Sequence, residues 1–170
     1  MSRFIFRNKA LFLILFLGIV LSACSNTEEK SAPAFELPDL DGNIVSLQDI
    51  ADSGQKVYVK FWTSWCNVCI DGLEELDELA SMDLDFTVLT VIHPGYNAEK
   101  SSLDKFLEWY EPLGYENIPI LVDQDGKWTS QFNIMAYPTS FYIDENLVLS
   151  DPVLGNQSID QIIDTINNLN

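Results

Sequence analysis

Cys66 and Cys69, separated by two residues, form the pair in this chain best suited to chemistry. Residues three apart on the first turn of a helix share one face, so their sulfur atoms lie close enough to form a disulfide. The unpaired N–H groups and the dipole at that helix end would stabilise a thiolate on Cys66, the nucleophile of thiol–disulfide exchange. Cys69 would then resolve the mixed disulfide. The spacing therefore predicts a redox-active dithiol.

The flanking sequence predicts a strand that leads into the cysteines and a helix that follows them. In residues 56–62, every position after Lys56 is apolar except Lys60, which is typical of a strand buried on both faces. A helical pattern runs over residues 66–82, with a bend expected at Gly72. Residues 85–92 form a second buried strand. This β-α-β order predicts two parallel strands joined by a right-handed crossover.

The remaining patterns complete one α/β domain over residues 35–170. An Asp-Gly-Asn turn at residues 41–43 predicts a hairpin between short β runs. Ser158 and Gln161 form a capping box at the start of the last amphipathic helix. The other expected elements are a helix from Ser101–Ser102 to Tyr110, a strand at 119–122, a short helix at 127–132, antiparallel strands at 140–143 and 147–149, and the last helix at 158–169.

The N-terminus has the pattern of an export signal. Basic residues precede an apolar run over residues 10–21, which is too short for a stable membrane span. The sequence Leu-Ser-Ala-Cys that ends at Cys24 resembles the cleavage box of bacterial lipoproteins, in which the cysteine is acylated. Residues 1–23 are then a signal peptide and residues 24–34 a flexible, lipidated tether. The alternative is an ordinary signal or an uncleaved anchor in which Cys24 is incidental.

The charge of the chain excludes nucleic acid as a partner. The net charge is −17, from 9 basic and 26 acidic residues. Residues 1–23 contain Arg3, Arg7 and Lys9 and no acidic residue, so the rest of the chain has 6 basic and 26 acidic residues, a charge of −20. Such a domain repels nucleic acid and anionic surfaces. Without an arginine, it also cannot clamp a phosphate with a guanidinium group.

Two motifs together carry a family resemblance. The sequence from Phe61 to Cys69 follows a buried strand, and Tyr137-Pro138-Thr139 precedes a later one. This combination resembles the thioredoxin fold, and the hairpin and helical segment 98–111 resemble its membrane-anchored TlpA/ResA-like branch. The resemblance covers residues 35–169 and implies a central mixed sheet flanked by helices. It also implies a cis Pro138 facing the cysteines, a partner chain that pairs with the backbone before it, and Trp65 in the docking surface.

Two shorter stretches narrow the resemblance. Val59 to Cys66 and Thr90 to Tyr96 are similar to thioredoxin-like surface proteins that reduce methionine sulfoxide reductases in Gram-positive bacteria. The resemblance implies that electrons pass from a CcdA-type membrane carrier through Cys66 and Cys69 to the reductase. It implies a lipid-anchored protein at the extracytoplasmic face of the membrane. We expect a monomer that needs no cofactor.

The chain departs from the family at two places. Many thioredoxins have a buried acid where this chain has Lys60, which would favour a thiolate if its amine is buried. The alternative is a lysine whose amine reaches solvent. The residues between the cysteines are Asn67-Val68 instead of the usual pair with proline, which leaves the redox potential and the direction of electron flow open.

Other functions also stay open at this stage. The same dithiol could reduce apocytochrome cysteines for haem attachment, or oxidise exported thiols. A copper chaperone could use Cys66, Cys69 and His93, the one histidine of the chain, because thiolates and imidazole suit copper. His93 could instead tune the active site, or be an ordinary loop residue.

Overall fold

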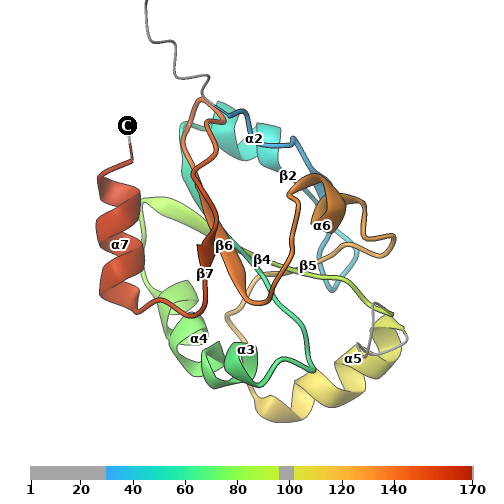
Figure 1. The fold of residues 1–170 in the computed structure, drawn as a ribbon. Coiled ribbons are helices and arrows are strands. Elements are labelled where there is room, and N and C mark those ends of the chain that lie inside the picture. The colour runs from blue at the N-terminus through green and yellow to red at the C-terminus, as the bar shows by residue number, and fades with distance from the viewer. Residues whose placement is uncertain (1–29, 96–101, 170) are drawn as a thin grey trace, which may run out of the picture.

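The computed structural model describes residues 30–95 and 102–169. A five-stranded sheet lies at its centre, in the order β5-β4-β3-β6-β7 (Figure 1). These strands are β3 (Lys56–Phe61), β4 (Phe86–Ile92), β5 (Ile120–Val122), β6 (Thr139–Ile143) and β7 (Val153–Leu154). A separate antiparallel hairpin is formed by β1 (Glu36–Pro38) and β2 (Ile44–Ser46). The fold is thioredoxin-like, as the sequence predicted.

Strand β3 occupies the middle of the sheet and sets the direction of its neighbours. It runs parallel to β4 and antiparallel to β6, with Phe61 opposite Thr139 and Val57 opposite Ile143. The parallel pair with a helical crossover confirms the predicted β-α-β unit. Because β6 runs the opposite way, the end of β3 that leads to the cysteines lies beside the start of β6. The end of β6, after Ile143, lies at the opposite edge of the sheet.

Helices cover both faces of this sheet. One face holds α3 (Asn67–Asp71), α4 (Leu73–Ser81), α5 (Leu103–Tyr110) with the 3-10 turn Glu111–Leu113, and α7 (Ile159–Asn167). The other face holds the hairpin, α2 (Leu47–Asp52) and α6 (Lys127–Gln131). Tyr58 of β3 packs into the first core and Val59 into the second. Lys60 is two residues from Tyr58 and therefore points to the face that α3 covers.

The helix predicted over residues 66–82 is divided at Gly72, which confirms the expected bend. Gly72 ends α3 and precedes α4 with φ −101°, a conformation open to any residue. Space explains the glycine better, because a Cβ atom there would lie 2.6 Å from the carboxamide atoms of Asn156. The loop before α7 thus packs directly onto the break between the helices.

Three segments differ from the sequence prediction. The partner of β6 is β7, whereas residues 147–149 make only single bridges, such as Leu149 with Ile143. These residues form a turn instead, because the Asp144 carboxylate accepts the N–H groups of Asn146 and Val148. Leu147 in this turn has φ +63°. Helix α2 was not predicted. Residues 30–34 were expected to belong to the tether, but Ser31 and Ala32 pack onto the domain.

The described chain starts beside the turn that follows β6. Ser31 bridges Val148, and the N–H of Ala32 donates to the carbonyl oxygen of Leu147 at 2.7 Å. The side chain of Ala32 is buried in the second core. Residues 30–32 therefore lie at the ends of the central strands that are opposite the cysteines. Residues 1–29, including the proposed signal and Cys24, lie outside the described part, in which no helix is long and apolar enough to cross a membrane.

Candidate active site

Cys66 and Cys69 form a disulfide at the start of α3, with Cα atoms 5.2 Å apart. Cys66 is the N-cap residue of this helix, and its Sγ accepts a hydrogen bond from the backbone N–H of Cys69 at 3.1 Å. Cys69 has no exposed surface, whereas Cys66 is 9% exposed. Cys66 is therefore the more accessible of the two residues, and the attacking role of Cys66 with the resolving role of Cys69 stays a prediction.

The loop before β6 lies against the outer sulfur atom. Cys66 Sγ is 3.6 Å from the carbonyl oxygen of Tyr137, and the Tyr137–Pro138 peptide bond is cis, as the resemblance implied. The hydroxyl of Thr139 donates to the carbonyl oxygen of Ala136 at 2.7 Å and holds the loop closed. The backbone before Pro138 is thus placed where an extended partner chain would lie beside the disulfide.

Apolar side chains are exposed at positions close in sequence to the two cysteines and to Tyr137. Trp65 is 37% exposed and meets the ring of Tyr137 edge to face, with centroids 5.8 Å apart. Val68 is 53% exposed and Met135 84% exposed. We call Trp65, Val68 and Met135 the apolar rim. Exposed apolar patches of this kind mark protein-binding surfaces. Sequence analysis identified only Trp65 of this rim, although a methionine two residues before Tyr137 was a usable signal.

Lys60 lies beneath the active-site helix and is only 3% exposed. Its Nζ donates to Oδ1 of Asn156 at 2.9 Å. Burial lowers the pKa of Lys60 from 10.5 to about 8, and the negative charge of Glu75 opposes this change. Of the two interpretations left open by the sequence, the buried amine is the one that the structure shows.

Asn156 is the residue that sequence analysis missed. Besides accepting from Lys60, its Nδ2 donates to the carbonyl oxygen of Val68 at 2.6 Å. Its carboxamide therefore joins the buried amine to the backbone between the two cysteines. In the sequence, the Gly-Asn-Gln stretch around it resembles an ordinary turn, so only the glycine at position 72 hinted at a side chain packed there.

His93 does not join the cysteines in a metal site. Within residues 30–95 and 102–169, no group of three or more His, Cys, Asp or Glu side chains lies close enough to hold a metal ion. The imidazole instead packs against Gly126, where a Cβ atom would overlap it. It lines a hollow of about 240 Å³ together with Thr129, Asn133 and Met135.

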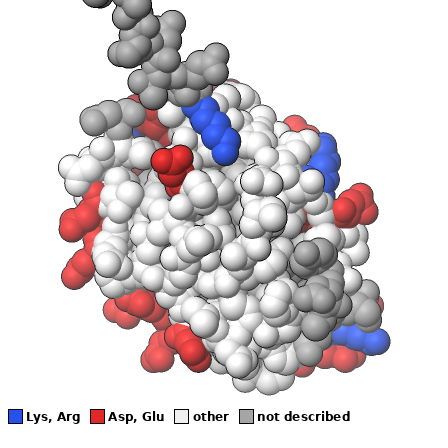
Figure 2. Space-filling model, viewed as in Figure 1, with Lys and Arg blue, Asp and Glu red and all other residues white. Residues whose placement is uncertain are grey.

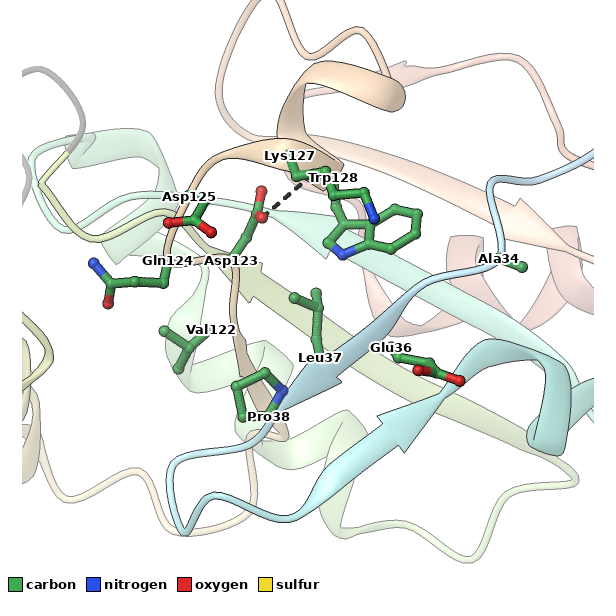
Figure 3. Close-up of a pocket in the computed structure, with 10 residues that line it drawn as sticks. All are labelled: Ala34, Glu36, Leu37, Pro38, Val122, Asp123, Gln124, Asp125, Lys127 and Trp128. Carbon is green, nitrogen blue, oxygen red and sulfur yellow. Dashed lines mark hydrogen bonds between the residues drawn. The ribbon is translucent and has the colours of Figure 1, made fainter.

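A hollow of about 430 Å³ lies between β1, the end of β5 and α6 (Figure 3). This is the sheet face opposite α3, so the hollow is separate from the disulfide. Asp123 at the edge of this hollow has a structural role, because its carboxylate accepts the N–H groups of Trp128 at 3.2 Å and Thr129 at 2.7 Å. Lys127 places its amine 4.3 Å from the centre of the Trp128 ring. These contacts support α6 rather than any redox chemistry.

The surface agrees with the strongly acidic composition. In Figure 2, Asp and Glu side chains lie mainly around the margin of the face shown, and its middle is largely uncharged. The few Lys and Arg side chains on the visible part of this face are scattered and do not gather into a basic patch.

The comparisons with known proteins agree with this site. Residues 29–151 match the AhpC/TSA family. The thioredoxin-like protein YneN of Bacillus subtilis is 33% identical over 77% of this chain and 74% of its own length. The thiol-disulfide oxidoreductase ResA of Bacillus thuringiensis is 25% identical over 92% of this chain and 94% of its own length.

Among solved structures, the pneumococcal exposed lipoprotein thioredoxin (Etrx1) of Streptococcus pneumoniae superposes with a TM-score of 0.74 and 40% identity. The match covers 81% of this chain and all of that one. In this chain, the site in question is the Cys66–Cys69 disulfide beside the cis Tyr137–Pro138 bond. The chain belongs to the thioredoxin-like AhpC/TSA family and is a thiol–disulfide oxidoreductase.

Proposed function

We propose that this oxidoreductase works outside the cytoplasm as a dithiol reductant. It would take electrons from a CcdA-type membrane carrier and pass them to a methionine sulfoxide reductase. The observation that carries the proposal is the asymmetric disulfide beside the Tyr137 carbonyl and the apolar rim, which suits docking of a folded protein partner. The likeness of residues 59–66 and 90–96 to surface reductants of that enzyme supports this choice of client.

The proposed exchange conserves two electrons and two protons. The reduced Cys66 thiolate attacks the client disulfide and forms a mixed disulfide, and the distal client sulfur leaves. Cys69 then attacks Cys66, the disulfide of the oxidoreductase forms, and the second client thiolate is released. A membrane dithiol reverses these steps on the oxidised protein. Reduction of its disulfide to the dithiol would return the methionine sulfoxide reductase to its active form.

We also propose attachment to the membrane through acylated Cys24. The lipoprotein-like cleavage box supports this proposal, as does the 40% identity with a protein described as an exposed lipoprotein. Metabolic labelling with a radioactive fatty acid tests it. Label should be found on the wild-type protein and be absent from Cys24→Ala, which should also be released from the membrane. Equal labelling of both proteins would refute acylation at this residue.

Trapping of mixed disulfides tests the client directly. Cys69→Ala, expressed at its natural level, should accumulate disulfide-linked complexes through Cys66 because the resolving thiol is absent. We expect a methionine sulfoxide reductase and a polytopic thiol carrier among them. Cys66→Ala with Cys69 intact is the matched control and should trap neither. Complexes with many unrelated exported proteins instead would identify a general oxidase or reductant.

The redox potential tests the direction of flow. A reductant should have a potential near that of thioredoxin, about −270 mV, whereas an oxidase should lie near −120 mV. Equilibration of the purified protein with glutathione or dithiothreitol buffers measures this value. A strongly oxidising potential would overturn the assignment as reductant while leaving the exchange chemistry in place.

A further inference from the structure

Asn156 connects two parts of the active site that are far apart in the chain. It lies in the loop between β7 and α7, accepts from the buried Lys60 amine at 2.9 Å and donates to the Val68 carbonyl oxygen at 2.6 Å. The second contact has a clear cause. Helix α3 has five residues, so its last carbonyl groups, Val68 among them, lack partners within the helix. Asn156 supplies one from outside.

The fold makes room for this side chain. Asn156 is itself exposed, but its carboxamide lies over Gly72 so closely that a Cβ atom there would come within 2.6 Å of it. Gly72 is buried and has an ordinary negative φ, so the need for a glycine is spatial. Asn156 therefore contacts both Gly72 and the amine of Lys60, whose own exposure is only 3%.

The charges around the Lys60 amine come from few groups. Glu75 of α4 is the carboxylate whose charge acts on it, and Oε1 of Glu75 also accepts the N–H of Ile159 at the start of α7. The phenols of Tyr58 and Tyr142 lie on the same sheet face, and burial raises the pKa of both, so they stay neutral. Cys69 of α3 packs in this same core.

We infer that Asn156 is a positioning residue for the dithiol chemistry: it holds the Lys60 amine beneath α3, where a positive charge stabilises the thiolate formed when the disulfide opens. This inference rests on the exchange reaction of the family and not on the identity of donor or client. A lysine fixed by an asparagine thus stands where other thioredoxins have a buried acid.

The charge acts on one identifiable step. As the resolving nucleophile, the Cys69 thiolate attacks Cys66, the Cys66–Cys69 bond forms, and the bond from Cys66 to the client sulfur breaks. The client leaves as a thiolate and takes up a proton from water. In the reverse direction, a donor thiolate attacks Cys66 and leaves the electron pair on Cys69. Both directions put negative charge on a sulfur atom that is fully buried in the disulfide form, and a nearby ammonium group favours that charge.

Reaction of the reduced protein with dithiobis(nitrobenzoate) separates this step from the first. Attack by Cys66 releases one coloured thiolate, and attack by Cys69 releases the second. We would record both phases against pH for wild type, Asn156→Ala and Gly72→Ala. The Cβ of Gly72→Ala would displace the carboxamide of Asn156 at little cost, since the end of a flexible side chain can move.

We expect Asn156→Ala to slow the second phase about tenfold near neutral pH, with its pH midpoint moved up by about one unit. The rates should converge with wild type at high pH, where the thiolate forms without help. Gly72→Ala should give the same shift. Asn156→Asp should also raise the midpoint without leaving a cavity, because its carboxylate neutralises the Lys60 charge. The first phase should not change.

Three results would overturn the inference. One is a second phase whose pH profile superimposes on wild type in Asn156→Ala. Another is a rate reduced by the same factor at every pH, which indicates a purely structural role. The third is a further shift of the pH midpoint when Asn156→Ala is added to Lys60→Met. If the two residues act together, the second substitution should cause no additional shift. Asn168→Ala, at the other end of α7, is the matched control and should leave both phases unchanged.

The assay is independent of the proposed client. Since the probe is a small aromatic disulfide, failure to trap a methionine sulfoxide reductase would leave this inference intact. An unmoved pH profile would conversely leave the proposed client untouched.

Discussion

Trp65 and Tyr137 are in contact beside the disulfide, ring edge to ring face at 83°, although 71 residues separate Cys66 from the Tyr137 carbonyl next to it. The helix side and the loop side of the active site thus meet through one aromatic pair. Such pairs contribute about 0.5–1.5 kcal/mol beyond their buried area. Because Trp65 remains 37% exposed, it is available to a partner as well as to Tyr137.

Replacement of Trp65 by alanine should weaken docking more than chemistry. We expect KM for a protein client to rise severalfold, since aromatic anchors dominate such surfaces, while the rate with a small aromatic disulfide changes little. Met82→Ala, which removes another exposed apolar side chain far from the disulfide in sequence, is the control. Equal losses with protein and small substrates would show that Trp65 shapes the disulfide itself instead of the docking surface.

The stability of the oxidised protein should depend on pH through Lys60. Burial lowers its pKa from 10.5 to about 8, so between these values the unfolded chain binds the proton and the folded protein does not. The free energy of unfolding therefore rises with pH across this window. Below it, the folded protein carries a buried ammonium at a cost on the order of 3 kcal/mol.

Urea unfolding of wild type and Lys60→Met at neutral and alkaline pH measures this effect. The variant should be the more stable protein near pH 7, and its advantage should shrink as the pH approaches 10.5. Groups other than Lys60 cancel in the difference between the two proteins. A difference that stays constant over this range would mean that the amine keeps an ordinary pKa.

Asp123 should matter for stability and not for redox chemistry. Its carboxylate accepts two backbone N–H groups at the start of α6 and is 2% exposed. Asp123→Ala leaves these donors without their partner and should lower the free energy of unfolding by about 1–3 kcal/mol. Asp125→Ala, an exposed residue in the same turn, should have a negligible effect. Comparable losses in the two variants would rule out the capping role.

Removal of the His93 imidazole should leave copper binding unchanged. The structure packs this side chain against Gly126, and the described residues contain no three-ligand group. Titration of the reduced protein with Cu(I) against a competing chelator should give the same affinity for wild type and His93→Ala. A loss of tenfold or more in the variant would revive the copper chaperone and count against a pure dithiol role.

Sequence alone was sufficient where local patterns decide the structure. The apolar run of β3, the Cys-x-x-Cys pair and the capping box of Ser158 and Gln161 each depend on neighbours within one turn or strand. Residues 147–149 looked like a strand by the same criteria. There the Asp144 carboxylate accepts the N–H of Val148, and residues 30–32 form backbone hydrogen bonds with Leu147 and Leu149. Strand β7 pairs with β6 instead. Neither set of hydrogen bonds is visible in a local pattern.

The site shows the same division. Cys66 and Cys69 follow from spacing, and Pro138 follows from the family resemblance. The buried amine of Lys60 is hydrogen-bonded to Asn156, which is 96 positions away in another loop. A polar residue in a turn carries no sign of such a partner in the sequence. The fold brings the two together only because β3 and the loop before α7 meet beneath α3.

The contacts of residues 30–32 with the turn after β6 determine which end of the domain an N-terminal attachment would hold. These residues are fastened beside Val148, at the edge of the sheet reached by the far end of β6, while the disulfide follows the opposite end of β3. The six residues of β3 alone span about 20 Å. Any attachment through the N-terminus therefore holds the domain at the end of the sheet opposite the disulfide. With the proposed anchor at Cys24, the disulfide would face away from the membrane, and the proposed membrane donor would reach it only by extending outward or after the domain reorients.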